Sequence, residues 1–92
     1  MNFEWDPDKA EYNLRKHGVS FQEAATVLGN DASITIYDPD HSDDEDRFIT
    51  IGWSYQRRLL MVSHTDRGEN IRIISSRKLT KSERKAYEEY IR

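Results

Sequence analysis

The chain has 92 residues, of which 36% are hydrophobic and 34% charged, with a net charge of −3 and no cysteine. This length allows one domain with one modest core, and the lack of a long apolar run excludes a membrane-spanning helix. The missing cysteine excludes disulfides, thiolate zinc sites and a cysteine nucleophile. We therefore expect one domain over residues 1–92. Because the first residues lack the basic and apolar regions of a signal peptide, we expect it in the cytoplasm.

The first half of the chain predicts a short strand and then a helical hairpin. Residues 3–5 alternate apolar and polar side chains, as in an edge strand. Asp6 as N-cap and Pro7 at the first helical position predict a first helix that runs to about His17 and stops at Gly18. Ser20 and Glu23 have the spacing of a capping box, which begins a second helix ending near Gly29. The inner face of the first helix is predicted at Ala10, Leu14 and His17.

The second half predicts four strands and a last helix. The strands are expected at residues 33–37, 47–53, 59–65 and 70–76. The links between the later strands are short, which indicates antiparallel hairpins. A second capping-box pattern, Thr80 with Glu83, begins a helix that runs to the end of the chain. The predicted fold class is α+β, with helices packed on a four-strand antiparallel meander.

The charges are distributed unevenly along the chain. Residues 1–46 hold three basic and twelve acidic side chains, a net charge of −9, whereas residues 47–92 hold eleven basic and five acidic ones, a net charge of +6. Affinity for phosphate depends on the local cluster and not on the total charge. The positive charge of the second half is therefore consistent with a nucleic-acid partner, and it is equally consistent with an ordinary solvated surface.

No metal site or cofactor is predicted. The acidic loop at residues 38–46 fails as a calcium loop, because Asp43 replaces the required Gly and Ile49 replaces the closing Glu. The three histidines lie 24 and 23 residues apart along the chain, which fits no zinc motif. The chain also has no G-x-S-x-G nucleophile elbow and no Gly-rich phosphate loop.

A basic face of the sheet is the candidate site. Its polar positions could bring together His64, Arg72, Arg77 and Arg47. Arginine binds phosphate through two parallel hydrogen bonds, and histidine moves a proton near pH 7. Such a set can cleave RNA without metal: the ribose 2′-OH attacks the neighbouring phosphorus, a base takes its proton and cations stabilise the phosphorane. The alternative is that these side chains only line the wet face of a half-covered sheet.

Four sequence blocks resemble the BrnT family of bacterial type II toxins, and the resemblance covers nearly the whole chain. They are W-D-x-x-K at residues 5–9, N-x-x-K-H-G-[VI]-x-F at 13–21, E-x-R-[FY]-x-x-I-G at 45–52 and R-[IL]-I-S-x-R at 72–77. In the third block Asp46 stands next to the Arg, a slight departure from the pattern.

The resemblance implies a RelE-like fold, metal-independent ribonuclease activity and growth arrest through blocked translation. It also implies a BrnA-like ribbon-helix-helix antitoxin that covers the toxin and binds operator DNA on its behalf. We expect a cytoplasmic endoribonuclease toxin that acts on RNA, with no membrane partner. A non-catalytic RNA- or protein-binding module with the same fold is the second hypothesis, and a structural protein is the third.

The resemblance and the residue chemistry together nominate seven site residues. The catalytic candidates are His64, Arg72, Arg77, Lys16 and His17. The substrate-binding candidates are Arg47 and Lys78. An enzyme requires His64 and the arginines to converge on one phosphate position, whereas a binding module requires only a basic stripe.

Overall fold

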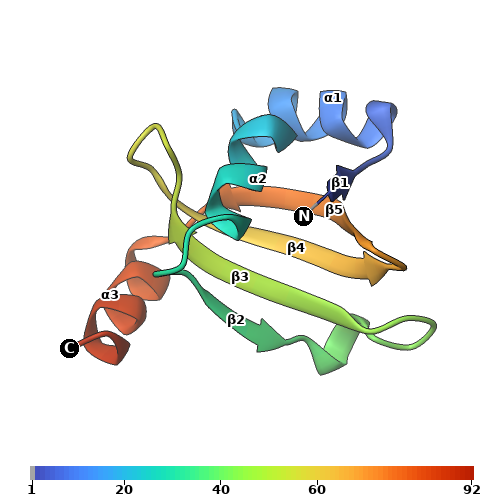
Figure 1. Ribbon diagram of the computed structural model, residues 1–92. Helices are drawn as coiled ribbons and strands as arrows, with labels where there is room; N and C mark the ends of the chain where they lie inside the picture. Colours follow the sequence, from blue (N-terminus) through green and yellow to red (C-terminus); the bar gives the residue numbers. More distant parts are fainter. Residues whose placement is uncertain (1) are drawn as a thin grey trace.

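The computed structural model describes residues 2–92, and Figure 1 shows the arrangement of their elements. In chain order the elements are β1 (Asn2–Glu4), α1 (Pro7–His17), α2 (Phe21–Leu28), β2 (Ile34–Tyr37), the short 3₁₀ helix η1 (Pro39–His41), β3 (Arg47–Trp53), β4 (Leu59–Arg67), β5 (Asn70–Lys78) and α3 (Lys81–Tyr90). All the predicted strands and helices are present, and β4 and β5 each continue two residues beyond their predicted ends.

The helix ends follow the predicted capping in two of three cases. The Asp6 side chain accepts a hydrogen bond from the Asp8 N–H at the start of α1, and Gly18 ends that helix in the left-handed region at φ +69°. At the start of α3, Thr80 and Glu83 form a complete capping box. In α2 only half of the predicted box forms: Ser20 accepts from the Glu23 N–H, but the Glu23 side chain turns into the protein.

The buried Glu23 carboxylate ties α2 to the turn between β3 and β4. It accepts a hydrogen bond from the Ser54 hydroxyl at 2.6 Å and from the Arg58 guanidinium through Nε at 2.9 Å. These donors, chiefly Arg58, hold the pKa of Glu23 below its ordinary value. Because its charge is paired and hydrogen-bonded, a carboxylate can remain in the core at this point.

The sheet has five strands in the order β1-β5-β4-β3-β2. The four strands from β2 to β5 form the predicted antiparallel meander, with β3 paired to β4 from Arg47–Thr65 to Trp53–Leu59. β1 adds to the other side of β5 in parallel, with Phe3 opposite Ile71. The sheet is therefore mixed and not purely antiparallel. Short links predict which consecutive strands pair, but nothing in them specifies where a strand from the other end of the chain joins.

One irregularity between β4 and β5 decides which side chains share a face. Ser63 lies opposite Ser75, but the next residue of β4, His64, lies opposite Ile73, so Ile74 is an extra residue in β5. Such a β-bulge shifts the alternation of the bulged strand by one position. On either side of it, Val62 pairs with Ser76 and Thr65 pairs with Arg72.

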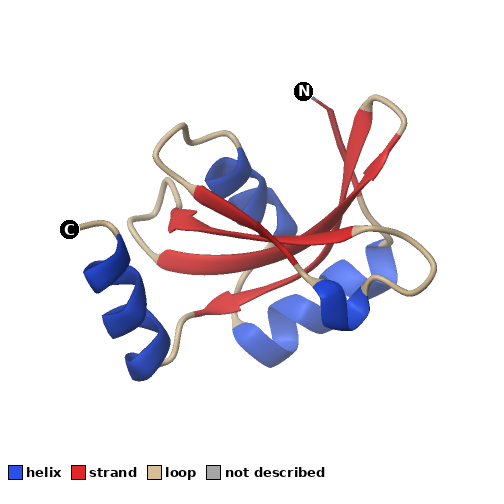
Figure 2. Cartoon of the chain, turned by 90° about the horizontal axis from the view of Figure 1, so that it is seen from below, coloured by secondary structure: helices blue, strands red, loops and turns tan. Residues whose placement is uncertain are grey.

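The sheet has two chemically different sides. The helix face (Leu60, Val62 and His64 in β4) is covered by α1 and α2, and its core also contains Val19, Phe21, Ala24, Val27 and Ile73. The far face (Met61, Ser63 and Thr65 in β4) is the opposite side, because successive side chains of a strand point to opposite faces. Figure 2 shows α3 apart from the other helices at one end of the sheet.

The face of α1 that meets the sheet is centred on Asn13 and not on Leu14. Leu14 is 51% exposed, whereas Asn13 is buried. The Asn13 amide donates to the Val19 and Ser76 carbonyls and accepts from the Ser76 N–H, all within 3.0 Å. A buried amide with three hydrogen bonds to other elements fixes the helix on β5. Reading only apolar residues as the inner face is therefore wrong for this helix.

On the far face, α3 packs against the half of the sheet near β2. Tyr87 is buried there, and the groove beside it is lined by Ile34, Ile51 and Met61, all far-face residues. Tyr90, three residues further along the same helix, is 74% exposed. The half of the far face near β5 and β1 carries the polar residues.

Gly52 provides a test of how tightly α2 and the loop before β2 pack on the sheet. A Cβ built on Gly52 would lie 2.8 Å from the Ser33 Cβ, whereas the nearest atom to one built on Gly29 is 3.8 Å away. We expect Gly52→Ala to lower the free energy of unfolding by about 1–3 kcal/mol through overpacking. Gly29→Ala, at a helical φ of −85°, should leave it unchanged or raise it by up to about 1 kcal/mol. Chemical denaturation measures both, and equal stability of the two variants would contradict the packing seen at Gly52.

Candidate active site

The structure separates His64 from the arginines that were predicted to join it. Arg72 lies opposite Thr65, and Arg77 lies opposite Met61, so both are on the far face. His64 is the neighbour of Thr65 in β4 and therefore points to the helix face. The expectation that these three side chains converge is wrong. It assumed that the polar side chains of β4 and β5 all point to the same face of the sheet.

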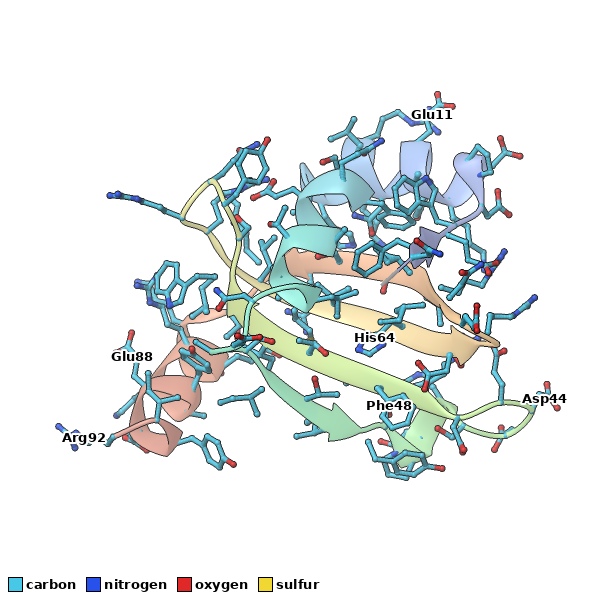
Figure 3. The ribbon with its side chains drawn as sticks, in the orientation of Figure 1. Glu11, Asp44, Phe48, His64, Glu88 and Arg92 are labelled. Carbon is cyan, nitrogen blue, oxygen red and sulfur yellow. The ribbon has the colours of Figure 1, made fainter. Side chains whose placement is uncertain are left out.

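His64 is a buried residue of the helix face. Only 6% of it is exposed, and its ring stacks on Phe48 of the neighbouring strand (Figure 3). Nε2 lies 2.7 Å from the Thr50 hydroxyl, which in turn lies 2.7 Å from the Thr35 hydroxyl. Nδ1 is buried without a hydrogen-bond partner among the described residues. Burial lowers the pKa of the imidazole, so His64 is neutral at pH 7.

The far face presents a cross-strand row in which two arginines flank a threonine. Arg47 of β3 and Arg72 of β5 are the two partners of Thr65 in β4. Side chains directly opposite on one face have Cβ atoms about 4.5–5.5 Å apart. The Arg47 Nε is buried without an acceptor among residues 2–92. A buried donor without a partner is uncommon, and this guanidinium therefore has hydrogen-bonding capacity that no acceptor within residues 2–92 uses.

The row ends at Glu4 of β1. Glu4 lies opposite Arg72 in the parallel register, and its carboxylate accepts from Arg72 Nη1 at 3.0 Å and from the Asn70 amide at 3.2 Å. The hydrogen bond from Asn70, with that from Arg72, lowers the pKa of Glu4. The carboxylate is therefore ionised at neutral pH and holds the guanidinium in place.

Arg77 lies on the same face but in a different row. Thr65 and Met61, which face the two arginines, are four residues apart, so their backbones are about 13 Å apart along β4. Arg77 donates to both oxygens of Glu83, at 2.7 and 2.9 Å, and thereby joins β5 to the first turn of α3. This pair, together with the Thr80 N–H, holds the pKa of Glu83 at about 2. Ser63 and Ser75 lie between the two arginine rows.

The other nominated residues lie away from this row. Lys16 and His17 are in the last turn of α1, on the side of the molecule that covers the helix face. Lys16 is exposed and lies over the Tyr12 ring, 5.6 Å from its centroid. Lys78 pairs with Leu60, on the helix face at the end of β5. The structure thus brings together Arg47, Arg72 and, further along the sheet, Arg77.

Sequence reasoning did not select the carboxylates of the site. Glu4 and Glu83 each hold one of the nominated arginines. The sequence pattern predicts Glu83 only as a capping residue and Glu4 only as the polar residue of an alternating strand. Arg67 is another far-face residue that was not selected, although the sequence pattern indicates it. It follows Ser63 and Thr65 at intervals of two in β4, so it shares their face, and it lies opposite Asn70.

No group of three or more His, Asp or Glu side chains within residues 2–92 is placed to hold a metal ion. None of the helices in that range has the length and apolar character required to cross a membrane.

Comparison with known proteins identifies the family to which this fold and sequence belong. Residues 5–83 match the family model of BrnT, the ribonuclease toxin of a type II toxin-antitoxin system. The chain belongs to the BrnT family. It is also similar to the crystal structure of the Brucella abortus ribonuclease toxin BrnT, with a TM-score of 0.65 and 25% sequence identity over 88% of this chain and 99% of that one. No curated protein sequence gives a significant match.

Family membership confirms the resemblance seen in the sequence. The matched segment contains the whole far-face row apart from Glu4, and all of β2 to β5. As a BrnT-family ribonuclease toxin, the chain has RNA as its substrate class and an antitoxin as its partner.

The burial of His64 makes the stability of the protein depend on pH. Its pKa is lowered in the folded state, so between that value and the ordinary 6.5 the unfolded chain binds more protons. Stability from the neutral imidazole is therefore present above about pH 6.5 and is lost as the pH falls through the folded pKa. We expect the native protein to lose more stability between about pH 8 and pH 5 than His64→Gln does. Urea denaturation at several pH values measures this, and parallel curves for the two proteins would show that His64 is not held neutral.

Proposed function

We propose that this BrnT-family chain is a metal-independent endoribonuclease whose cleavage site is the far-face row of Arg47, Thr65 and Arg72. The observation that carries the proposal is the pair of guanidinium groups on either side of one buried threonine, one of them with an unpartnered buried nitrogen. Guanidinium groups match the geometry of a phosphate and stay charged at every relevant pH. Family membership supplies the reaction class.

In this mechanism the arginines act on the charge that develops at phosphorus. The ribose 2′-OH attacks the adjacent phosphate to give a phosphorane with additional negative charge on its oxygens. Arg47 and Arg72 donate hydrogen bonds to those oxygens, and such contacts accelerate a reaction only as far as they are stronger in the transition state. The 5′ oxygen then leaves and takes a proton from solvent, and the upstream fragment ends in a 2′,3′-cyclic phosphate.

Glu4 is the candidate proton acceptor. In the free protein its carboxylate holds Arg72. When the RNA phosphate takes over Arg72, Glu4 loses a hydrogen-bond donor and a nearby positive charge, so its pKa rises toward the ordinary value. The carboxylate then lies beside the reacting ribose and is a better base than it was in the free protein.

The remaining features that the resemblance implies complete the proposal. The chain acts in the cytoplasm as a single RelE-like domain and arrests growth by blocking translation. A BrnA-like ribbon-helix-helix antitoxin neutralises it, and operator DNA is contacted only through that antitoxin. The positive second half of the chain favours an acidic antitoxin segment on the far face. Lys16, His17 and His64 stay predictions as catalytic residues, and Lys78 stays one as a substrate-binding residue.

A second function is favoured by one observation. The far-face row is basic and contains no histidine, and a basic row without an imidazole is sufficient for a non-catalytic RNA-binding module. Family membership favours the ribonuclease. A cleavage assay separates the two functions.

Cleavage without metal is the first expectation. The purified protein should cut single-stranded RNA in excess EDTA and leave a 2′,3′-cyclic phosphate, because the arginines and not a metal ion stabilise the phosphorane. End-group analysis by mass spectrometry identifies the product. An RNA with 2′-deoxyribose at the cut site serves as the control and should stay intact. Activity that appears only with added magnesium would reject this mechanism.

Substitutions in the row should separate chemistry from folding. Arg72→Ala should lower the cleavage rate about 100- to 1000-fold, the usual effect of removing one transition-state donor. Glu4→Gln should lower the rate and flatten its acid limb, because the carboxamide cannot take the proton. Arg92→Ala, an exposed change far along the chain, is the control. Single-turnover rates across pH, with thermal unfolding measured in parallel, distinguish these effects, and full activity of Arg72→Ala would place the site elsewhere.

A further inference from the structure

A second positively charged site lies at the opposite end of the sheet from the acidic loop. A hollow of about 250 Å³ is formed where the β3–β4 turn, the end of β5 and the first turn of α3 meet. Its lining consists of four basic side chains, one indole and two leucines: Arg57, Arg58, Lys78, Arg84, Trp53, Leu59 and Leu79. No carboxylate lines it, although the chain has seventeen acidic residues.

The positive charge of this hollow is only partly neutralised. Arg58 is paired with the buried Glu23, and Arg84 with Glu88 at 2.9 Å. No carboxylate within residues 2–92 lies within 4.0 Å of Arg57 or Lys78, and both are exposed. Arg57 is at the tip of the turn with φ +60°, a conformation that only a few non-glycine residues adopt. The two free charges therefore border the hollow from β5 and from the turn.

An aromatic ring is available beside these charges. Trp53 is 38% exposed, and the Arg84 guanidinium lies 5.2 Å from the centroid of its ring. Sites for single-stranded nucleic acid combine cations that bind the backbone with aromatic rings on which bases stack. The cations would also bind an acidic peptide, but an acidic peptide has no bases to stack on the indole ring.

The hollow continues the line of the proposed cleavage site. Leu59 is six residues from Thr65 in β4, so the two sites are about 20 Å apart, and Arg77 lies between them. The acidic loop that contains Asp44 is at the other end of β3, where it does not repel a strand that reaches the hollow (Figure 3).

We infer that this hollow is a second RNA subsite, in which Arg57 and Lys78 bind a backbone phosphate and Trp53 stacks on a base several nucleotides from the cut. The inference rests on the proposed ribonuclease function and extends it by naming where the substrate strand runs. It assigns no part in the chemistry to these residues.

The test measures binding separately from cleavage. The probe is a fluorescein-labelled, mixed-sequence 2′-O-methyl RNA of 20 nucleotides, which cannot be cut because it lacks the attacking hydroxyl. Arg57→Ala with Lys78→Ala should weaken its binding about tenfold or more. The slope of log K against log salt should fall by about 0.7 for each lost phosphate contact. RNA should quench tryptophan fluorescence in the native protein and not in Trp53→Phe.

The matched control removes the same charge elsewhere. Lys85→Ala with Arg92→Ala removes one positive charge from the middle of α3 and one from beyond its end, both close to Glu88 and Glu89. This variant should bind the probe as the native protein does. An equal loss of affinity in both double variants would overturn the inference, because it would show an effect of total charge. So would quenching of Trp53 by a glutamate-rich 20-residue peptide but not by RNA, which would assign the hollow to an acidic protein segment.

Cleavage of unmodified RNA by the native protein in EDTA keeps the two proposals apart. If the native protein cuts RNA but Arg57→Ala with Lys78→Ala binds the probe normally, the subsite is wrong and the ribonuclease function stands. If the native protein binds the probe through these residues but cuts no RNA, the proposed function fails and the binding site stands.

Discussion

The extra residue in β5, Ile74, decides which side chains can act together. Arg72 and Arg77 are five positions apart, so in a regular strand they would point to opposite faces. The bulge restores a common face, because Ser75 and Arg77 lie opposite Ser63 and Met61 while Arg72 lies opposite Thr65. The same shift lets Ile73 and Ser76 both face the helices, where Ser76 receives the Asn13 amide. Core and site are thus fixed by one irregularity, as is common where a bulge redirects a functional side chain.

The far face holds its positive charges in ion pairs. Arg72 is held by Glu4 and Arg77 by Glu83, while the Arg47 guanidinium lies 3.8 Å from Glu45. Partly exposed pairs of this kind contribute little to stability. Their effect is to keep flexible arginine side chains ordered, so that less conformational entropy is lost when a phosphate replaces the carboxylate. In the proposed function, RNA competes with an internal anion at each of these arginines, and its affinity depends on how completely the phosphate replaces that anion.

Most of the fold could be predicted from local signals, and most of the site could not. Asp6, Ser20, Thr80 and Gly18 mark helix ends through chemistry that involves only near neighbours. The alternation of side-chain types correctly predicted both the first and the last residue of β3. The parallel pairing of β1, the bulge at Ile74 and the partners of Glu4 and Glu23 each depend on residues far along the chain. The alternation of apolar and polar residues does not report contacts between distant parts of the chain. For this reason the sequence pattern placed His64 on the wrong face of the sheet.

The position of His64 on the helix face determines which groups are available for catalysis on the far face. A histidine that stacks on Phe48 and hydrogen-bonds to Thr50 links β3 to β4 from the helix side, so this candidate residue has a packing role. With the imidazole behind the sheet, the far-face row has guanidinium groups that cannot give up a proton and one carboxylate, Glu4, that is paired with Arg72. In the mechanism we propose, the rate enhancement comes chiefly from fixed positive charge aimed at the phosphorane, and proton transfer contributes less. This balance fits an enzyme that exchanges its own ion pairs for those with its substrate, because binding the phosphate is then the same event that frees the base.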